Sequence, residues 1–105
     1  MEAFKIDDLV AQQAAGKRPY LEFLRHPSLS LGLYVLPAGG VDPQQPHNED
    51  EVYYIVSGQG QIDVGDKTQP VQPGSLVFVA AHMPHKFHSI TEELKILVFF
   101  APAET

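Results

Sequence analysis

Imidazole and carboxylate side chains stand in two short clusters of this chain that can hold a metal ion. The first cluster places His47 four residues before Glu51, directly ahead of an apolar run. The second cluster, His82-Met-Pro-His85-Lys-Phe-His88, follows about a strand pair later. Two imidazoles and one carboxylate on a β scaffold form a facial triad that holds divalent iron, manganese, nickel or zinc and leaves coordination positions open. The leading hypothesis is a metal site inside a small β-barrel.

Side-chain alternation decides which of these residues can face a barrel interior. Successive side chains of a strand point to opposite faces, so Glu51 shares its face with Tyr53. If that face is the interior, an unpaired carboxylate there is costly, and a metal ion or a cationic partner removes the cost. The same alternation groups His85 with Phe87 and puts His88 on the other side. We therefore expect His85 to point inward and His88 outward.

The segments that must position these residues are mainly short β-type runs. Residues 7–15 predict a helix that belongs to a docking arm, with Asp7 or Asp8 as its N-cap and Gly16 as its stop. From about residue 18 onward, apolar runs alternate with Pro and Gly turn signals, which predicts a sandwich or jelly-roll barrel. Eight strands are expected, over residues 20–24, 29–36, 51–57, 60–64, 69–71, 76–79, 85–89 and 94–100.

Length and composition exclude several function classes. The 105 residues show no repeat or linker, so we expect one domain over residues 1–105. The chain has no cysteine, which excludes thiolate metal centres and cysteine nucleophiles. A formal net charge of −6, with only seven Lys and Arg, argues against nucleic acids and anionic membranes as partners. The sequence contains neither a signal peptide nor a long apolar stretch, so we expect a cytoplasmic protein.

Two motifs of the chain resemble those of the cupin superfamily. The first family motif, Gly-x5-His-x-His-x3-4-Glu-x6-Gly, is matched in spacing by Gly39-x5-Gln45-x-His47-x3-Glu51-x6-Gly58, with Gln45 where the first histidine stands. The second, Gly-x5-Pro-x-Gly-x2-His-x3-Asn, corresponds to Gly74-x5-Ala80-x-His82-x2-His85-x3-Ser89 and keeps the first glycine and the ligand histidine. The resemblance covers about residues 30–100 and leaves the N-terminal arm, residues 1–18, outside it.

The resemblance implies an all-β fold, a single jelly-roll barrel with a short N-terminal helical arm, and one divalent metal ion near the barrel centre. Its ligands would be His47, Glu51 and His85. Gln45 would either offer a fourth, oxygen ligand, which suits Mn or Fe more than Cu or Zn, or hydrogen-bond a bound water. The alternative is that the motif persists as scaffold without the metal. Glu49 shares the alternation of His47 and Glu51, but we expect a solvated carboxylate because it lies in a turn.

Glu51, His82 and Tyr53 are the candidate catalytic residues. His82 is expected at the barrel rim, as a fourth ligand, as an acid–base group that titrates near neutral pH, or as an exposed loop histidine. Tyr53 lines a substrate cavity or belongs to the core, and the same alternatives apply to Phe78 and Phe87.

These features together predict a mononuclear metalloenzyme of oxygenase, isomerase or lyase type that acts on a small organic molecule, with the ion polarising substrate oxygens. The fold does not choose the reaction. The alternatives are a non-catalytic module that binds a small ligand, and an apo barrel kept as a dimerisation scaffold. We expect a homodimer formed through the apolar strands 20–24 and 94–100. The chain has no helix-turn-helix segment, which argues against a DNA-binding regulator.

Overall fold

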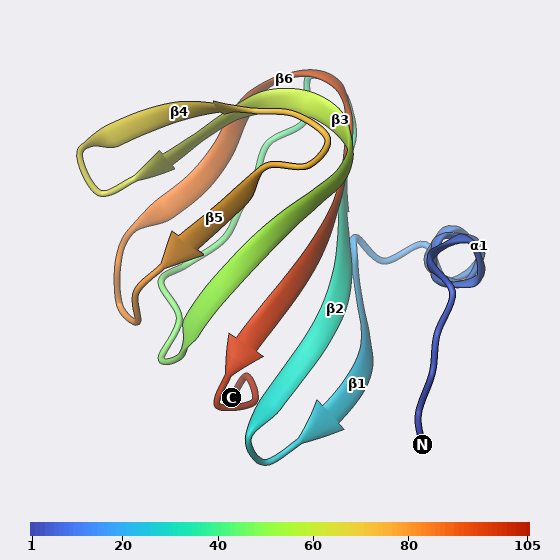
Figure 1. The fold of residues 1–105 in the computed structure, drawn as a ribbon. Helices are drawn as coiled ribbons and strands as arrows, with labels where there is room; N and C mark the ends of the chain where they lie inside the picture. The colour runs from blue at the N-terminus through green and yellow to red at the C-terminus, as the bar shows by residue number, and fades with distance from the viewer.

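Six antiparallel strands and one N-terminal helix make up the fold of residues 1–105 in the computed structural model (Figure 1). The strands follow the order β1-β2-β6-β3-β4, and β5 pairs with β3 outside this path. This arrangement confirms the all-β prediction with a helical arm. The elements are α1 (Ile6–Gly16), β1 (Tyr20–His26), β2 (Leu29–Leu36), β3 (Asp50–Val64), β4 (Lys67–Val71), β5 (Leu76–Val79) and β6 (His85–Ala101).

The two long strands β3 and β6 pair along most of their length and bend together. The first half of β3 pairs with the last residues of β6, and its second half pairs with the first residues of β6. The register shifts repeatedly between Ile55 and Gln61, around Gly58, whose φ is 97°. Because these irregularities are bulges within a strand, the prediction of eight strands is wrong, and residues 51–57 and 60–64 belong to one strand. Residues 85–89 and 94–100 are joined in the same way in β6.

The bend brings two layers of sheet face to face around an apolar interior. Tyr53 and Ile55 of β3 are fully buried there, and so is the Glu51 side chain, as the alternation along the strand predicts. His85 and Phe87 of β6 also point inward. The largest cluster of the core consists of Tyr34, Leu36, Tyr53, Ile55, Ile62, Val71, Val79, Phe87, Ile90, Leu94, Ile96, Val98 and Phe100.

The ends of helix α1 differ from the prediction. The N-cap residue is Lys5, and no side chain caps the helix, so neither Asp7 nor Asp8 is the cap. Both aspartates lie in the first turn instead, where a carboxylate interacts favourably with the helix dipole. Gly16 is the last helical residue, and the chain turns away at Lys17, whose left-handed conformation has φ 61°.

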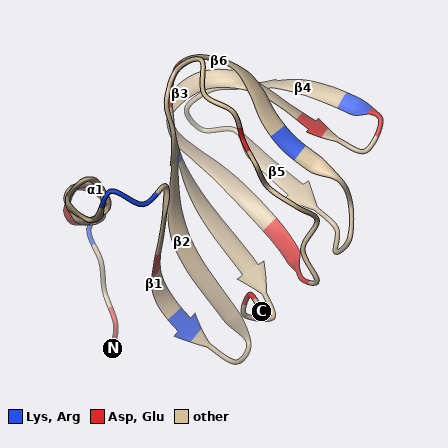
Figure 2. Cartoon of the chain, turned by 180° about the vertical axis from the view of Figure 1, so that it is seen from behind, with Lys and Arg blue, Asp and Glu red and all other residues tan.

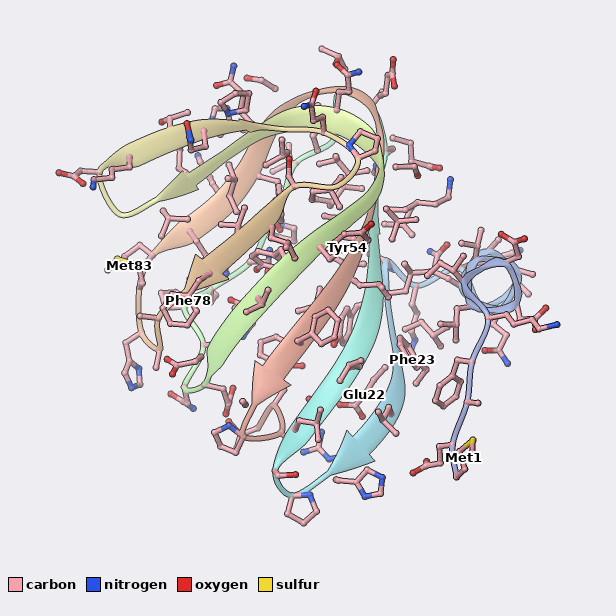
Figure 3. All side chains as sticks on the ribbon, in the orientation of Figure 1. Met1, Glu22, Phe23, Tyr54, Phe78 and Met83 are labelled. Carbon is pink, nitrogen blue, oxygen red and sulfur yellow. The ribbon has the colours of Figure 1, made fainter.

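Helix α1 packs against the outer face of the sheet beside β1 and β2. Leu9 of the helix is buried against Leu33 and Val35 of β2. Phe23 of β1 also contributes to this contact, on the side of the sheet that faces the N-terminal segment in Figure 3. No helix of the structure has the length and apolar character needed to cross a membrane. The cytoplasmic location stays a prediction.

Another part of the outer surface, over β3 and β5, keeps large apolar side chains exposed. Leu76 and Phe78 of β5 are 68% and 61% exposed, and Tyr54 of β3 is 37% exposed. Tyr54 is paired with Leu76 and Val52 with Phe78, so these side chains share one face of the sheet. Figure 3 shows Tyr54 and Phe78 on this face, away from α1. We call the four residues the outer apolar patch.

Candidate metal centre

His47, Glu51 and His85 meet at one end of the barrel interior, and their ligand atoms all lie within 4.8 Å of one another. Glu51 is the second residue of β3, and His85 is the first residue of β6. His47 lies in the loop between β2 and β3. The side chains of Glu51 and His85 are 1% exposed, whereas that of His47 is 19% exposed. The three residues predicted as ligands are therefore gathered into one cluster that opens on the His47 side.

The donor atoms of this cluster suit a divalent cation. Glu51 Oε1 lies 3.0 Å from His85 Nε2 and 3.9 Å from His47 Nε2. Neither carboxylate oxygen of Glu51 makes a hydrogen bond, and the short approach of His85 Nε2 lacks hydrogen-bond geometry. Ions bound at about 2.0–2.2 Å hold such ligands about 3 to 3.5 Å apart. A cation would therefore offset the cost of burying the Glu51 carboxylate without a partner.

Both histidines are oriented by their other ring nitrogen. His85 Nδ1 donates to the carbonyl oxygen of Met83 at 2.8 Å, which leaves the Nε2 lone pair directed toward Glu51. His47 Nδ1 lies 3.3 Å from Glu104 Oε2, and its Nε2 lies 3.2 Å from Gln44 Oε1. An ion bound at Nε2 would replace the contact with Gln44 and leave the proton on Nδ1, which faces Glu104. Carbonyl and carboxylate partners of this kind fix the tautomer and ring orientation of metal-binding histidines.

The negative charge of Glu51 affects the pKa of His85. Burial alone would lower the pKa of this imidazole, but the adjoining Glu51 carboxylate and the carbonyl of Met83 outweigh burial. The pKa of His85 is therefore raised above its ordinary value of 6.5. The site thus attracts a positive charge, whether a proton or a metal ion.

Gln45, predicted as a fourth ligand, is exposed, and its neighbour Gln44 reaches the cluster instead. Gln44 Oε1 lies 3.2 Å from His47 Nε2. The residues between β2 and β3 form no strand, so the alternation that grouped Gln45 with His47 does not apply to them. The motif spacing is kept, but the amide that points inward comes one residue earlier.

Asp42, which sequence reasoning missed, holds this loop in place. The carboxylate is buried and accepts hydrogen bonds from the Tyr34 hydroxyl at 2.7 Å and from the Phe87 backbone N–H at 2.9 Å. It also accepts from the side-chain amide of Gln44 at 2.8 Å, which turns Gln44 Oε1 toward His47. An Asp-Pro pair in a loop is common, so the sequence offers only a weak signal for this role.

Of the candidate catalytic residues, Tyr53 lies beside the His-Glu-His cluster and His82 lies outside it. Tyr53 is buried beside the cluster, and its hydroxyl donates to Gln44 Oε1 at 3.0 Å. Burial raises the pKa of Tyr53 far above its ordinary value of 10, so this hydroxyl serves as a hydrogen-bond donor. His82 is exposed and does not belong to the cluster. Its backbone N–H instead donates to the carbonyl oxygen of His47 at 2.7 Å, which ties the two loops together.

Glu49 and Phe78, which lie outside the cluster, are placed differently from what the sequence led us to expect. Glu49 is 3% exposed, so the prediction of a solvated carboxylate is wrong. It accepts hydrogen bonds from the backbone N–H and the hydroxyl of Thr105 at 3.1 Å and 2.8 Å. Figure 2 shows the acidic start of β3 near the C-terminal segment. Phe78 lies in the outer apolar patch and lines no interior cavity, whereas Phe87 belongs to the core.

A cavity of about 170 Å³ opens beside the cluster on the His47 side. Residues from both ends of the chain and from the loop line it. They include Tyr20, Tyr34, Gln44, His47, Phe100 and Glu104. A small molecule in this cavity would therefore lie in contact with one ligand of the candidate metal centre.

The fold and the site define a jelly-roll barrel with a His-Glu-His cluster of the kind that can hold a metal ion. Residues 32–100 match the family model described as the cupin domain. The chain belongs to the cupin family, and the resemblance seen in its two motifs is confirmed.

Relatives of the chain include both a full-length and a partial match. It is 50% identical over 105 residues to an uncharacterised protein of Streptomyces coelicolor, and this match covers 100% of both chains. It is 37% identical over 59 residues to L-ectoine synthase of Vibrio cholerae, a match that covers 55% of this chain and 43% of the synthase. The crystal structure of TT1209 from Thermus thermophilus shares the fold, with a TM-score of 0.76, 24% identity, and coverage of 98% of this chain and 99% of that one.

Proposed function

We propose that this cupin binds one divalent metal ion through His47, Glu51 and His85 and acts as a mononuclear metalloenzyme on a small organic molecule. The observation that carries the proposal is the convergence of three buried or half-buried ligand atoms, of which two have no hydrogen-bond partner, beside an open cavity. Iron, manganese, nickel and zinc all accept this set of nitrogen and oxygen donors. The partial likeness to L-ectoine synthase, a cupin enzyme, supports an enzymatic role.

A divalent ion at this position would supply Lewis acidity to an oxygen of the bound molecule. The protein's own residues supply orientation and exclusion of water. Gln44 and the Tyr53 hydroxyl present polar atoms next to His47, and Phe100 packs edge-on against the His47 ring with the centroids 5.0 Å apart. We propose a reaction of the oxygenase, isomerase or lyase type, since an ion with open coordination positions can take up dioxygen or a substrate oxygen.

Elemental analysis of the purified protein tests the metal site. We expect about one equivalent of a transition metal per chain, and a rise in melting temperature when metal is added to the chelated protein. His47→Asn, Glu51→Gln and His85→Asn should each lose most of the bound metal. His26→Asn serves as the matched control, because His26 lies at the surface and pairs only with Glu2. A wild-type protein without metal and without a metal-induced thermal shift would refute the proposal.

Measurements of turnover distinguish an enzyme from a non-catalytic module that binds a small ligand. Oxygen uptake with catechols, flavonols and diketones should reveal an oxygenase, and product analysis with sugar-type substrates should reveal an isomerase or lyase. Glu51→Gln should abolish any activity found. Ligand binding by the metal-loaded protein without turnover would instead favour the non-catalytic module.

A further inference from the structure

The cavity beside His47 has an acidic and aromatic wall, and neither lysine nor arginine lines it. Glu104 and the rings of Tyr20, Tyr34 and Phe100 make up much of this wall. Its composition bears on the chemical class of ligand, because a buried ligand charge needs a partner of opposite sign.

The Glu104 carboxylate is held in the wall by the C-terminal segment. The backbone N–H of Glu104 donates to Ser30 Oγ at 2.9 Å, and its carbonyl oxygen accepts from Arg25. Thr105 is bound to the buried Glu49, which anchors the next residue as well. One carboxylate oxygen of Glu104 faces His47 Nδ1, and the side chain is 27% exposed. The position of Glu104 is therefore set by the fold on both sides of the residue.

Negative charge dominates around this carboxylate. Glu104 is the acidic side chain of the cavity wall, and no lysine or arginine lines the cavity. Arg25 is the nearby cation, but its guanidinium is bound to the Glu22 carboxylate and to the Glu104 backbone. No lysine or arginine side chain is therefore paired with the Glu104 carboxylate, and a ligand cation in the cavity could pair with it.

Tyr20 offers a second sign that a polar ligand belongs in the cavity. Its hydroxyl is buried and has no hydrogen-bond partner, which is costly for a phenol that could otherwise reach water. Gly32 makes room for the ring, since a Cβ atom at this position would lie 2.1 Å from the Tyr20 ring. The Tyr34 ring packs edge-on against that of Tyr20, with the centroids 6.1 Å apart. The ring therefore lies at a fixed place in the wall, with its hydroxyl buried over Gly32 and unpaired.

We propose that this cavity binds a small organic molecule through a cationic nitrogen, an alkylammonium or amidinium group, held between the Glu104 carboxylate and the aromatic wall formed by Tyr20 and Tyr34. A carboxylate and aromatic faces are the two protein surfaces that stabilise such a cation. The size is suitable, because a cavity of about 150 Å³ accommodates benzene. The proposal rests on the proposed function, since it names the class of molecule that the same site accepts.

Three probes of one shape and different charge test this inference. Cyclohexylammonium, cyclohexanol and cyclohexanecarboxylate are titrated at neutral pH into the zinc-loaded protein, and binding is followed by NMR shifts of the Tyr20 and Glu104 signals. We expect the ammonium to bind at millimolar concentrations and at least about tenfold more tightly than the carboxylate. The metal-free protein is titrated in parallel, so that coordination of an amine by zinc cannot account for the result.

Variants of the wall residues test whether Glu104 and Tyr20 are responsible for ammonium binding. Glu104→Gln should weaken ammonium binding about tenfold and leave cyclohexanol binding unchanged. Glu92→Gln, an exposed carboxylate on β6, should change neither. Tyr20→Phe keeps the ring, removes the unpartnered hydroxyl, and should weaken the ammonium several-fold.

Specific outcomes would overturn the inference. These are carboxylate binding as tight as that of the ammonium, undiminished ammonium binding by Glu104→Gln, or no ammonium binding at all. Zinc content is measured in every sample, so a failure of metal binding is recorded separately from a failure of amine recognition. The titrations of the metal-free protein still decide the amine proposal if zinc does not bind.

Discussion

Glu51 and His85 meet inside the barrel with a carboxylate oxygen and an imidazole nitrogen 3.0 Å apart, and neither atom has a hydrogen-bond partner. They come from different strands, β3 and β6, and are not register partners, because Glu51 pairs with Phe100 and His85 with Val64. The contact therefore exists only in the closed barrel. Its stability depends on a positive charge at this place, which a proton or a metal ion can supply.

The metal-free protein should lose stability as the pH rises through the folded-state pKa of His85. That pKa is raised above 6.5, so the folded state binds the proton more tightly than the unfolded state. The resulting stabilisation is complete below about pH 6.5 and is lost as the pH rises through the raised pKa. Thermal melts in a chelator, between about pH 6 and pH 9, measure this effect. His85→Asn should flatten the dependence, and His26→Asn should keep it. Equal slopes in wild type and His85→Asn would contradict the prediction.

Asp42→Ala should destabilise the barrel and loosen the metal centre together. The variant removes the acceptor of the Tyr34 hydroxyl, the Phe87 N–H and the Gln44 amide. Hydrogen bonds to a charged group contribute about 1.5–3 kcal/mol each, so we expect a loss of at least about 3 kcal/mol. Urea unfolding measures the loss. Asp66→Ala, at an exposed turn, should remain within about 0.5 kcal/mol of wild type. A similar result for both variants would show that Asp42 does not hold the loop.

Gly58→Ala should be strongly destabilising, because Gly58 lies where β3 bends. Its φ of 97° is in a region that side chains avoid, and an added Cβ would lie 2.0 Å from the Glu93 carbonyl oxygen. We expect a loss of about 2 kcal/mol or more. Gly16→Ala is the control, since nothing lies within 4 Å of its added Cβ and alanine favours the helix. Circular dichroism melts compare the two, and a Gly58→Ala protein as stable as Gly16→Ala would contradict the account of the bend.

The homodimer expected from the sequence, through residues 20–24 and 94–100, stays a prediction, and we add the prediction that the outer apolar patch forms its interface. Helix α1 covers much of the outer face near β1, whereas the outer apolar patch on β3 and β5 is free. We therefore predict that light scattering at micromolar concentration gives the mass of two chains. The double variant Leu76→Lys with Phe78→Lys should give the mass of one chain. Glu92→Lys, a charge change outside the patch, should leave the dimer intact. A wild-type protein with the mass of one chain would contradict the prediction.

Regular spacing explains what the sequence could predict. Alternation along a strand placed Glu51 and His85 inside the barrel, and both are buried there. The turn residues and apolar runs predicted β2 and β5 with their observed bounds. These predictions succeeded because they depend on local geometry, which a few neighbouring residues determine.

Contacts between distant parts of the chain explain what the sequence could not predict. Glu49 is buried because the C-terminal residue Thr105 packs against it and donates hydrogen bonds to it. No local sequence pattern predicts a contact between residues so far apart in the chain. Gln44 rather than Gln45 faces His47, because Asp42 holds an irregular loop there. The alternation of side chains along a strand does not apply in such a loop. Gly58 indicates a turn by residue type, but the long pairing of β3 with β6 carries the strand through it.

The curvature of β6 has a consequence for the kinetics of the protein. This strand has 17 residues and would extend roughly 55 Å if it were straight. Its first residue, His85, nevertheless lies beside Glu51, whose register partner Phe100 is the last residue but one of the same strand. A bound ion thus joins the start of β6 to the start of β3, which pairs with the end of β6, and it can do so only after the sheet has rolled up. We predict that the ligands assemble after the rate-limiting step of folding, so that metal slows the unfolding of the barrel and leaves its folding rate nearly unchanged, which stopped-flow unfolding and refolding with and without metal would measure.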